Sequence, residues 1–268
     1  MAALRRGDAT GAPHEILDPR DLKYCSNQCT AHWAAEDDPF QWRERLPFAR
    51  WGLAELQLMG WPLLALAILL GAPGPPWCWA AAVPLVLLGL VIYFFRDPTR
   101  QIPDDLDAIV SPADGVIAEV TELEYYDFLD GPAVRIGIFL SIFNVHINRA
   151  PRDAQVIAMH YKPGEFLNAL NPESALRNEF MWIGLEDLQR PGTRLAVRQI
   201  SGLLARRIVC ALRPGMKVRR GEKFGMIKLG SRTELILPRD GVRVETAVGQ
   251  VVKAGSTVLA RFVALHDS

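Results

Sequence analysis

The sequence predicts a mainly β, α+β domain, built as a pseudo-symmetric β-sandwich or barrel, with an apolar helical hairpin on its N-terminal side. Three observations indicate this fold class. The long stretch from Leu56 to Phe95 carries no charged side chain. Most of the chain after it consists of short apolar runs bounded by Gly, Pro and Asp, which is typical of strands. Near the C-terminus, a glycine-bounded hairpin pattern occurs twice.

The chain has 268 residues, half of them apolar, which is enough for one sizeable domain with additional segments. Its 30 basic and 30 acidic residues balance, so the net charge does not indicate a partner. Residues 1–50 are polar, mixed in charge and broken by prolines, and we expect a flexible tail there. No apolar run follows Arg5 and Arg6, which argues against a targeting peptide.

The four cysteines form no obvious disulfide framework, and reduced thiols are the default in a protein that faces the cytosol. Cys25, Cys29 and His32 faintly resemble a metal-binding pattern. A fourth ligand is missing and the second spacing is short, so we expect no metal. The role of these three residues stays open.

Residues 51–95 are expected to form a hydrophobic membrane hairpin. Its two apolar runs, 61–70 and 83–93, are joined by a turn rich in Gly and Pro. A crossing needs roughly 20 apolar residues, so the hairpin either spans the bilayer twice or dips into one leaflet. Arginines flank the hairpin on both sides, which predicts both ends on the cytoplasmic face of the cell (inner) membrane. A buried helical hairpin of a soluble domain is the alternative.

Residues 96–268 are expected to form the β-rich domain. Apolar runs with alternation or β-branched residues predict strands at 115–120, 133–140, 154–161 and 195–200. The repeated pattern, Gly215–Phe224 and Gly249–Val258, places Gly and Val at equal offsets and suggests pseudo-symmetry. It also resembles the hammerhead hairpins of biotinyl and lipoyl carrier domains. A membrane-anchored carrier modified at Lys228 is therefore an alternative, as is a non-enzymatic membrane scaffold.

Basic residues gather in one acid-free part of the chain, between Leu188 and Gly221. Two interpretations account for these residues equally well. One is a solvated basic face, and the other is a surface that binds anionic lipid headgroups, where each Lys or Arg contributes about 1 kcal/mol of binding free energy. No nucleic-acid-binding fingerprint accompanies the charge, and we expect no nucleic-acid partner.

Three motifs carry residues that suit base-activated chemistry. They are Ser111-Pro112-Ala113-Asp114-Gly115, then Phe143 to Pro151 (FNVHINRAP), and then Phe224 to Ser231 (FGMIKLGS). They supply a carboxylate, an imidazole and a hydroxyl, which are the components of a catalytic triad. Each alone is unspecific, since Asp-Gly and Gly-Ser are ordinary turn dipeptides.

Together and in this order, the three motifs resemble those of the phosphatidylserine decarboxylase proenzymes, in their short bacterial and archaeal-type branch. The resemblance runs from about Phe94 to about Phe262. It implies a pyruvoyl-dependent enzyme that decarboxylates phosphatidylserine to phosphatidylethanolamine and carbon dioxide through a Schiff base. It also implies autocatalytic cleavage between Gly230 and Ser231, giving a β chain (1–230) and an α chain (231–268) from one precursor.

The same resemblance implies roles for individual residues. Ser231 would become the covalent pyruvoyl group, His146 would be the base, and Asp114 would orient His146. Phe166 would line the acyl or headgroup pocket. His160 and His266 have no motif partner and are expected to be structural. Because the hairpin contains no motif residue, we expect it to hold the protein on the bilayer without taking part in catalysis. The sequence leaves open the acyl-chain or ether-lipid preference, the membrane depth and a homo-oligomeric state.

Overall fold

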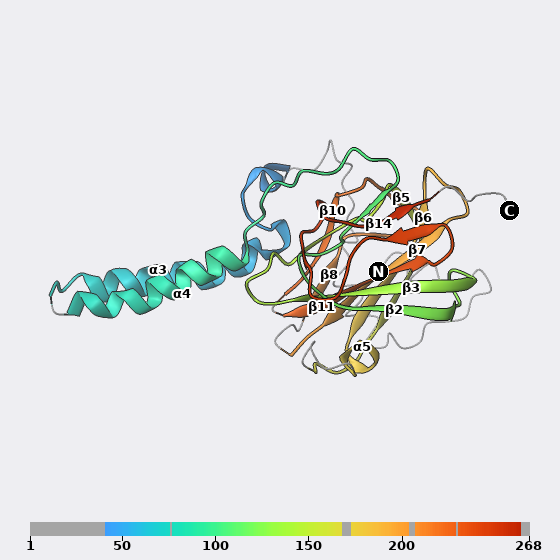
Figure 1. Ribbon diagram of the computed structural model, residues 1–268. Helices are drawn as coiled ribbons and strands as arrows, with labels where there is room; N and C mark the ends of the chain where they lie inside the picture. The colour runs from blue at the N-terminus through green and yellow to red at the C-terminus, as the bar shows by residue number, and fades with distance from the viewer. Residues whose placement is uncertain (1–40, 76, 168–172, 204–206, 229, 264–268) are drawn as a thin grey trace, which may run out of the picture.

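The computed structural model describes residues 41–75, 77–167, 173–203, 207–228 and 230–263. A β-rich body carries one long projection made of two helices (Figure 1). The predicted fold class, mainly β with an N-terminal apolar helical segment, is confirmed. Cys25, Cys29, His32 and His266 lie outside the described residues.

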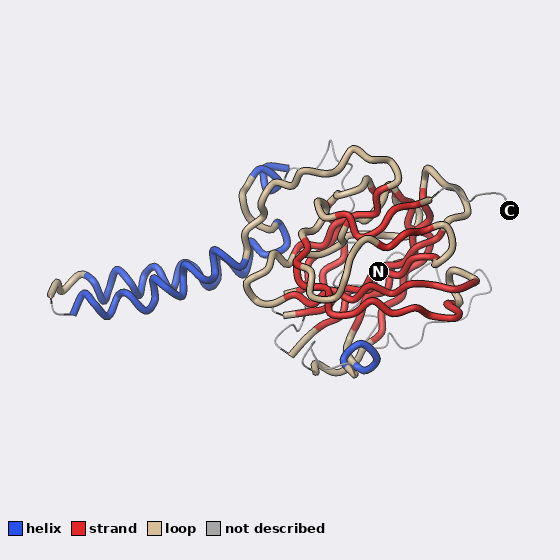
Figure 2. The backbone as a smooth tube through the Cα atoms, viewed as in Figure 1, coloured by secondary structure: helices blue, strands red, loops and turns tan. Residues whose placement is uncertain are grey.

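The projection is a helical hairpin. Helices α3 (Leu53–Gly71) and α4 (Ala82–Phe94) lie side by side and are connected through the 3-10 helix η3 (Trp77–Ala81) (Figure 2). Two further 3-10 helices precede it, η1 (Gln41–Arg45) and η2 (Arg50–Gly52).

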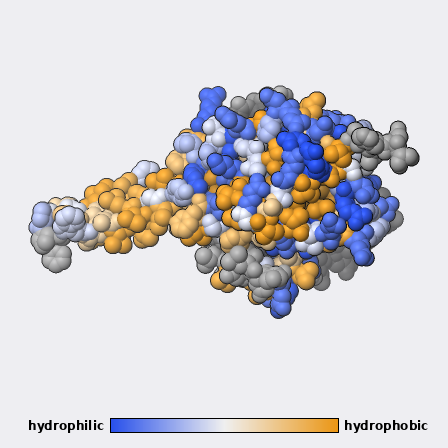
Figure 3. Space-filling view, in the orientation of Figure 1, coloured by the Kyte–Doolittle hydropathy of each residue, from blue (hydrophilic) through white to orange (hydrophobic). Residues whose placement is uncertain are grey.

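The surface of the hairpin is apolar along most of the face seen in Figure 3. Large side chains on both helices, such as Trp61, Leu69 and Val86, are exposed. The helix at Arg50–Gly71 is long and apolar enough to cross a membrane, while the apolar helix at Cys78–Phe94 is shorter. The hairpin is therefore not a core element of the β-rich body.

The body is organised by one eight-stranded sheet in the order β13-β2-β3-β11-β7-β6-β5-β9, in which every neighbouring pair is antiparallel. Its strands are, in chain order, β2 (Gly115–Tyr126), β3 (Gly131–Leu140), β5 (Ala154–Lys162), β6 (Phe180–Asp187), β7 (Arg194–Ser201), β9 (Lys217–Val218), β11 (Ser231–Pro238) and β13 (Val251–Val252).

Two three-stranded sheets complete the body, in the orders β1-β14-β12 and β4-β10-β8. Their strands are β1 (Ala108–Val110), β4 (Ile147–Arg149), β8 (Ile208–Cys210), β10 (Lys223–Ile227), β12 (Val242–Val244) and β14 (Val258–Phe262). The single turn α5 (Ser174–Arg177) precedes β6.

Strand β11 lies in the middle of the large sheet, and its side chains alternate between two environments. Leu235 and Leu237 join the main hydrophobic core, whereas Ile236 packs in a smaller cluster on the opposite side. Because side chains of a strand alternate between faces, Ser231 and Thr233 share the core face with Leu235. The core thus reaches the first residue of this strand.

The repeated glycine pattern forms two hairpins of matching geometry. Gly215 and Gly249 both have φ of 89°, and Gly221 and Gly255 have φ of 78° and 75°. Strands β9 and β13, which follow the first glycine of each pair, form the two edges of the large sheet. The repeat is therefore structural and relates the two halves of the body by pseudo-symmetry.

Two aspartates occupy equivalent places in these halves. The carboxylate of Asp114 accepts a hydrogen bond from the backbone N–H of Ala254 at 2.8 Å. The carboxylate of Asp153 accepts one from the backbone N–H of Arg220 at 2.9 Å. Ala254 and Arg220 each precede the second glycine of a repeat, so both aspartates hold a hairpin turn.

The basic span between Leu188 and Gly221 divides into two groups. Some of its arginines are tied to the body, since Arg198 forms an ion pair with the buried Glu234 and Arg220 donates to the carbonyl oxygen of Pro103. Others are exposed, including Arg194, Lys217 and Arg219. Part of the basic span therefore has an internal structural role.

Two glycines of the repeat offer a matched test of packing at the turns. A Cβ at Gly221 would lie 2.3 Å from the Cδ1 atom of Ile102, whereas a Cβ at Gly215 would meet nothing within 4 Å. Gly215→Ala should cost about 1–2 kcal/mol from its left-handed backbone. Gly221→Ala should cost more, because Ile102 must also move. Denaturant unfolding of both variants measures the difference, and equal losses would refute the packing argument.

Candidate active site

Ser231 is the first residue of β11 and is held from both sides. It pairs with Leu140 of β3 and with Ser201 of β7. The residue is completely buried, and within the described part of the chain its hydroxyl oxygen has no hydrogen-bond partner. A buried hydroxyl without a partner is costly, which marks this position for a function other than stability.

His146 lies at the end of the loop between β3 and β4 and is also completely buried. Its Nδ1 atom lies 2.9 Å from the carbonyl oxygen of Asn144, and its Nε2 atom accepts the backbone N–H of Gly230 at 3.3 Å. A carbonyl only accepts, so Nδ1 carries the proton and Nε2 presents its lone pair. The ring is thus a neutral base directed at the residue before Ser231.

The electrostatic environment keeps this ring neutral. Burial, with a smaller contribution from the charge of Arg96, lowers the pKa of His146 from 6.5 to about 4, against the raising effect of the Asn144 carbonyl. At neutral pH the imidazole is therefore unprotonated and able to accept a proton.

The connection between β10 and β11 turns sharply in front of Ser231. Gly230 adopts φ of 69°, a left-handed conformation that favours glycine. The backbone N–H of Ile227 donates to the carbonyl oxygen of His146 at 3.3 Å. The base and the Gly230–Ser231 bond are thereby tied to the same short piece of backbone.

The structure does not join Asp114 to His146. Both carboxylate oxygens of Asp114 bind Arg100, at 2.8 and 2.7 Å, and one of them also accepts the amide of Ala254. In the described residues, the group that orients His146 is the carbonyl of Asn144. The expected hydrogen bond between Asp114 and His146 is therefore absent, because each partner is satisfied elsewhere.

Asn148, which the sequence analysis did not single out, links the second motif to the first motif and to strands β7 and β11. Its side-chain amide donates to the hydroxyl of Thr233 at 3.1 Å and to the carbonyl of Pro112 at 3.3 Å, and its oxygen accepts from Gln199 at 2.9 Å. All these groups are buried. Asn148 lies two residues after His146, and this spacing along the motif is the signal that could have indicated it.

Glu179 is a second residue that sequence reasoning missed. It is buried, and its carbonyl accepts hydrogen bonds from both the N–H and the hydroxyl of Ser201. Because Ser201 pairs with Ser231, a buried carboxyl group lies one strand further across the sheet from the candidate nucleophile. Glu179 directly precedes β6, and its place beside Ser201 depends on the register of the strands, which the sequence pattern does not specify.

Phe166 lies near this end of the sheet. The residue is half-buried, and the adjacent Leu167 exchanges two hydrogen bonds with the side chain of Asn178. The same side chain donates to the carbonyl of Ser201 at 2.8 Å. The segment of Phe166 is therefore attached to the strand that pairs with Ser231. His160 is exposed, with its ring edge toward Phe180.

Lys228 does not lie at an exposed hairpin tip. It is only 8% exposed and forms an ion pair with Glu55 of α3. A carrier lysine must reach its modifying enzyme and its partners, so this burial argues against the carrier alternative.

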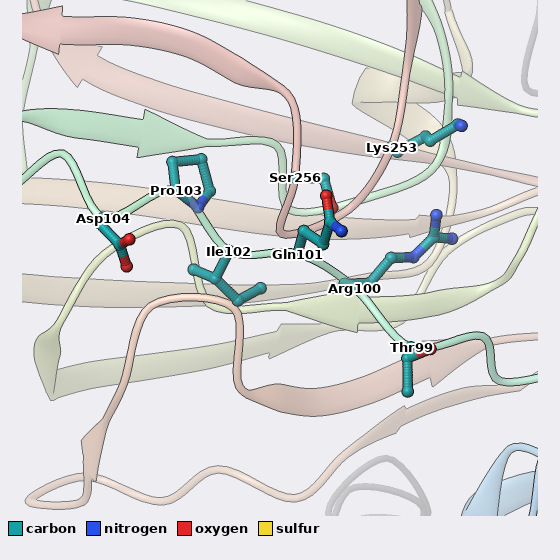
Figure 4. A pocket seen from close by; sticks show the side chains of 8 residues that line it. All are labelled: Thr99, Arg100, Gln101, Ile102, Pro103, Asp104, Lys253 and Ser256. Carbon is teal, nitrogen blue, oxygen red and sulfur yellow. The ribbon is translucent and has the colours of Figure 1, made fainter.

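An open pocket of about 790 Å³ lies away from Ser231, which is not among its lining residues. Its lining residues are Thr99, Arg100, Gln101, Ile102, Pro103, Asp104, Lys253 and Ser256 (Figure 4). Arg100 is the link to the motifs, since it also binds Asp114. Ser231 is therefore closed off from solvent and lies outside this pocket.

Comparison with known proteins identifies the family of the chain. A model of the phosphatidylserine decarboxylase family matches residues 87–260, more than half of the chain. A phosphatidylserine decarboxylase proenzyme of Rhodopirellula baltica is 50% identical over 244 residues, which cover 90% of this chain and 99% of that protein. The chain belongs to the phosphatidylserine decarboxylase family.

Further members of the family match most of the chain. Phosphatidylserine decarboxylase proenzymes of Carboxydothermus hydrogenoformans and Desulfotalea psychrophila are 43% and 41% identical, over 75% and 67% of this chain and 93% and 82% of their own lengths. The family resemblance read from the three motifs is thereby confirmed.

The burial of His146 generates a testable pH dependence of stability. Because the pKa is about 4 in the folded chain and 6.5 as its ordinary value, the unfolded state binds more protons between these limits. The contribution of the neutral His146 ring to the free energy of unfolding is therefore present above pH 6.5 and is lost as the pH falls toward 4. In a Ser231→Ala background, used so that both proteins are intact chains, the form with His146 should lose about 2 kcal/mol more free energy of unfolding than the form with His146→Gln between pH 7 and pH 5. Denaturant unfolding at both values measures this, and equal losses would contradict a buried neutral ring.

Proposed function

We propose that the protein decarboxylates phosphatidylserine to phosphatidylethanolamine and carbon dioxide, with a pyruvoyl group generated from its own Ser231. Membership of the family supports decarboxylase activity and synthesis as a proenzyme. One arrangement carries the pyruvoyl part of the proposal. Among the described residues the buried Ser231 hydroxyl has no hydrogen-bond partner, and the neutral imidazole of His146 contacts the adjacent Gly230. These residues suit a group that is made from the chain itself.

In the proposed maturation, His146 takes the proton of the Ser231 hydroxyl, whose oxygen attacks the carbonyl carbon of Gly230. The peptide C–N bond breaks, the proton passes to the Ser231 nitrogen, and an ester joins Gly230 to the Ser231 oxygen. Removal of the Cα proton of Ser231 then breaks the Cβ–O bond and releases Gly230 as a carboxylate. The remaining dehydroalanine takes up water and loses ammonia, which leaves a pyruvoyl group attached to Arg232.

The pyruvoyl ketone would supply the electron sink that decarboxylation needs, by forming a Schiff base with the substrate amine. The chain's own contribution is placement. Strand β11 would hold residue 231 between β3 and β7, and Arg232 is anchored through its ion pairs with Glu119 and Glu234, both at 2.9 Å. His146 would return a proton to the substrate carbon. Phe166 would line the pocket for the headgroup or acyl chain.

The membrane part of the proposal follows from the substrate. Phosphatidylserine is a lipid, so the β-rich domain (96–268) must work at the headgroup layer. The hairpin (51–95) would hold it on the cytoplasmic face of the cell membrane. The exposed basic residues Arg194, Lys217 and Arg219 would attract anionic lipids.

Maturation can be tested by intact-mass analysis. Wild type should yield fragments 1–230 and 231–268, the smaller one blocked to Edman degradation, and Ser231→Ala should stay full length. The fragments should co-purify until denatured, because β11, β13 and β14 of the α chain pair with strands of the β chain. A wild-type chain that stays intact under conditions of activity would sink the pyruvoyl mechanism.

The role of Asp114 can be separated from its structural role by its pseudo-symmetric counterpart. Asp114→Asn and Asp153→Asn each weaken one turn-holding hydrogen bond. If Asp114 also assists the base, Asp114→Asn should slow self-cleavage by at least roughly 10-fold, in the range typical of acid–base groups, while Asp153→Asn cleaves normally. Time courses of fragment formation decide this. Equal cleavage rates in the two variants would show that Asp114 only holds the hairpin turn and does not assist the base.

A further inference from the structure

The base of the membrane hairpin reaches the candidate cleavage site directly. Figure 1 shows the open end of the hairpin against the β-rich body. There the aromatic ring of Phe94, the last residue of α4, packs on the imidazole of His146, with ring centroids 4.4 Å apart and planes inclined by 36°. A residue of the hairpin therefore packs directly against the candidate base.

The other helix of the hairpin contacts the segment that precedes Gly230. Glu55, in the first turn of α3, forms an ion pair with Lys228, which lies two residues before Gly230. The backbone N–H of Lys228 also donates to the carbonyl of Arg207, whose guanidinium lies 3.9 Å from the Glu55 carboxylate. Burial lowers the pKa of Lys228, and Glu55 opposes this effect. Because Lys228 is buried, removing Glu55 leaves its charge without its ion-pair partner.

A third set of contacts fixes the loop that carries His146. The guanidinium of Arg96 donates to the carbonyl of Tyr93 at 2.6 Å and to the carbonyl of Phe143 at 2.8 Å. It thereby clamps the end of α4 to the loop. An apolar cluster continues this contact, formed by Ala49, Phe94, Phe95, Val145, Ile147 and Met226.

We propose that the base of the hairpin is a positioning element for self-cleavage, in which Phe94 and the Glu55–Lys228 ion pair hold His146 and Gly230 in reactive alignment. This inference rests on the proposed self-cleavage at Ser231. It differs from the expectation that the hairpin only attaches the protein to the bilayer. Phe94 and Glu55 are positioning residues, because they act through His146 and Lys228.

The two contacts come from different helices, and this makes the alignment depend on the hairpin as a unit. α4 supports the base, whereas α3 supports the segment that precedes the scissile bond. A change in the relative placement of the two helices would move His146 against Gly230. Misplacement by about 1 Å can cost 100-fold in rate.

The test is a time course of self-cleavage. The full-length chain is purified and reconstituted into vesicles of phosphatidylcholine and phosphatidylglycerol. Glu55→Gln and Lys228→Gln should each slow cleavage by roughly 10- to 100-fold. The double variant should be no slower than the slower single, because both changes break the same interaction. Arg50→Gln is the matched control, since it removes an ion pair with Glu44 at the hairpin base. It should cleave at the wild-type rate.

Phe94 is tested with two variants, because the larger truncation can unfold the base of the hairpin. Phe94→Leu keeps an apolar side chain and Phe94→Ala removes it, so cleavage should slow in that order. Thermal unfolding of each variant provides the structural readout. Slow cleavage with a native unfolding transition supports positioning, while slow cleavage that always follows loss of this transition overturns it.

The outcomes separate this inference from the function on which it rests. Failure of the wild-type chain to cleave would refute the proposed maturation. Normal cleavage in wild type, with wild-type rates in Glu55→Gln, Lys228→Gln and Phe94→Leu, would refute the positioning role alone.

Discussion

The pairing of β11 on both sides is the constraint on which the rest of the site depends. Ser231 begins this strand between Leu140 and Ser201, so its backbone position is set by two neighbouring strands. The residue before it belongs to a left-handed turn instead. In the proposed cleavage, the bond that breaks would lie between a fixed strand and a turn, and the attacking oxygen would belong to the fixed end. Placement of the base is then reduced to fixing His146 against Gly230, which the Ile227–His146 and Gly230–His146 hydrogen bonds accomplish.

Pseudo-symmetry explains why Asp114, a predicted site residue, has a structural role in holding a turn. The two halves repeat a glycine-bounded turn and an aspartate that holds it, and Asp114 is one of this pair. The halves differ in what they add. Asp114 also carries a buried ion pair with Arg100 beside the open pocket, whereas Asp153 accepts from the side chain of Gln189. A role for Asp114 beyond the turn must therefore act through Arg100 or through a rearrangement, because its oxygens are engaged in the uncut chain.

The sequence was informative where local patterns decide structure. The glycine repeat predicted paired turns, the charge-free stretch predicted the helical hairpin, and three motifs identified the family. It could not specify which groups meet across the fold. His146 is oriented by the carbonyl of Asn144, and a backbone carbonyl has no sequence signature. Asn148 and Glu179 depend on register between strands far apart in the chain. The contact of Phe94 with His146 depends on how the hairpin meets the body, which hydropathy does not encode.

The two sides of the Gly230–Ser231 bond are anchored to different parts of the molecule, and this asymmetry would have a mechanical consequence for the proposed cleavage. Ser231 is attached to the sheet, whereas Lys228 is attached through Glu55 to a helix of the membrane hairpin. While the chain is intact, the peptide bond joins these two anchors and keeps Ser231 buried. Once that bond is cut, the sheet would retain residue 231 and the hairpin would retain the new end of the β chain. The ends could then separate without disturbing the core. Because the nucleophile is buried before cleavage, such a separation is the step that would admit a lipid headgroup to the newly formed group.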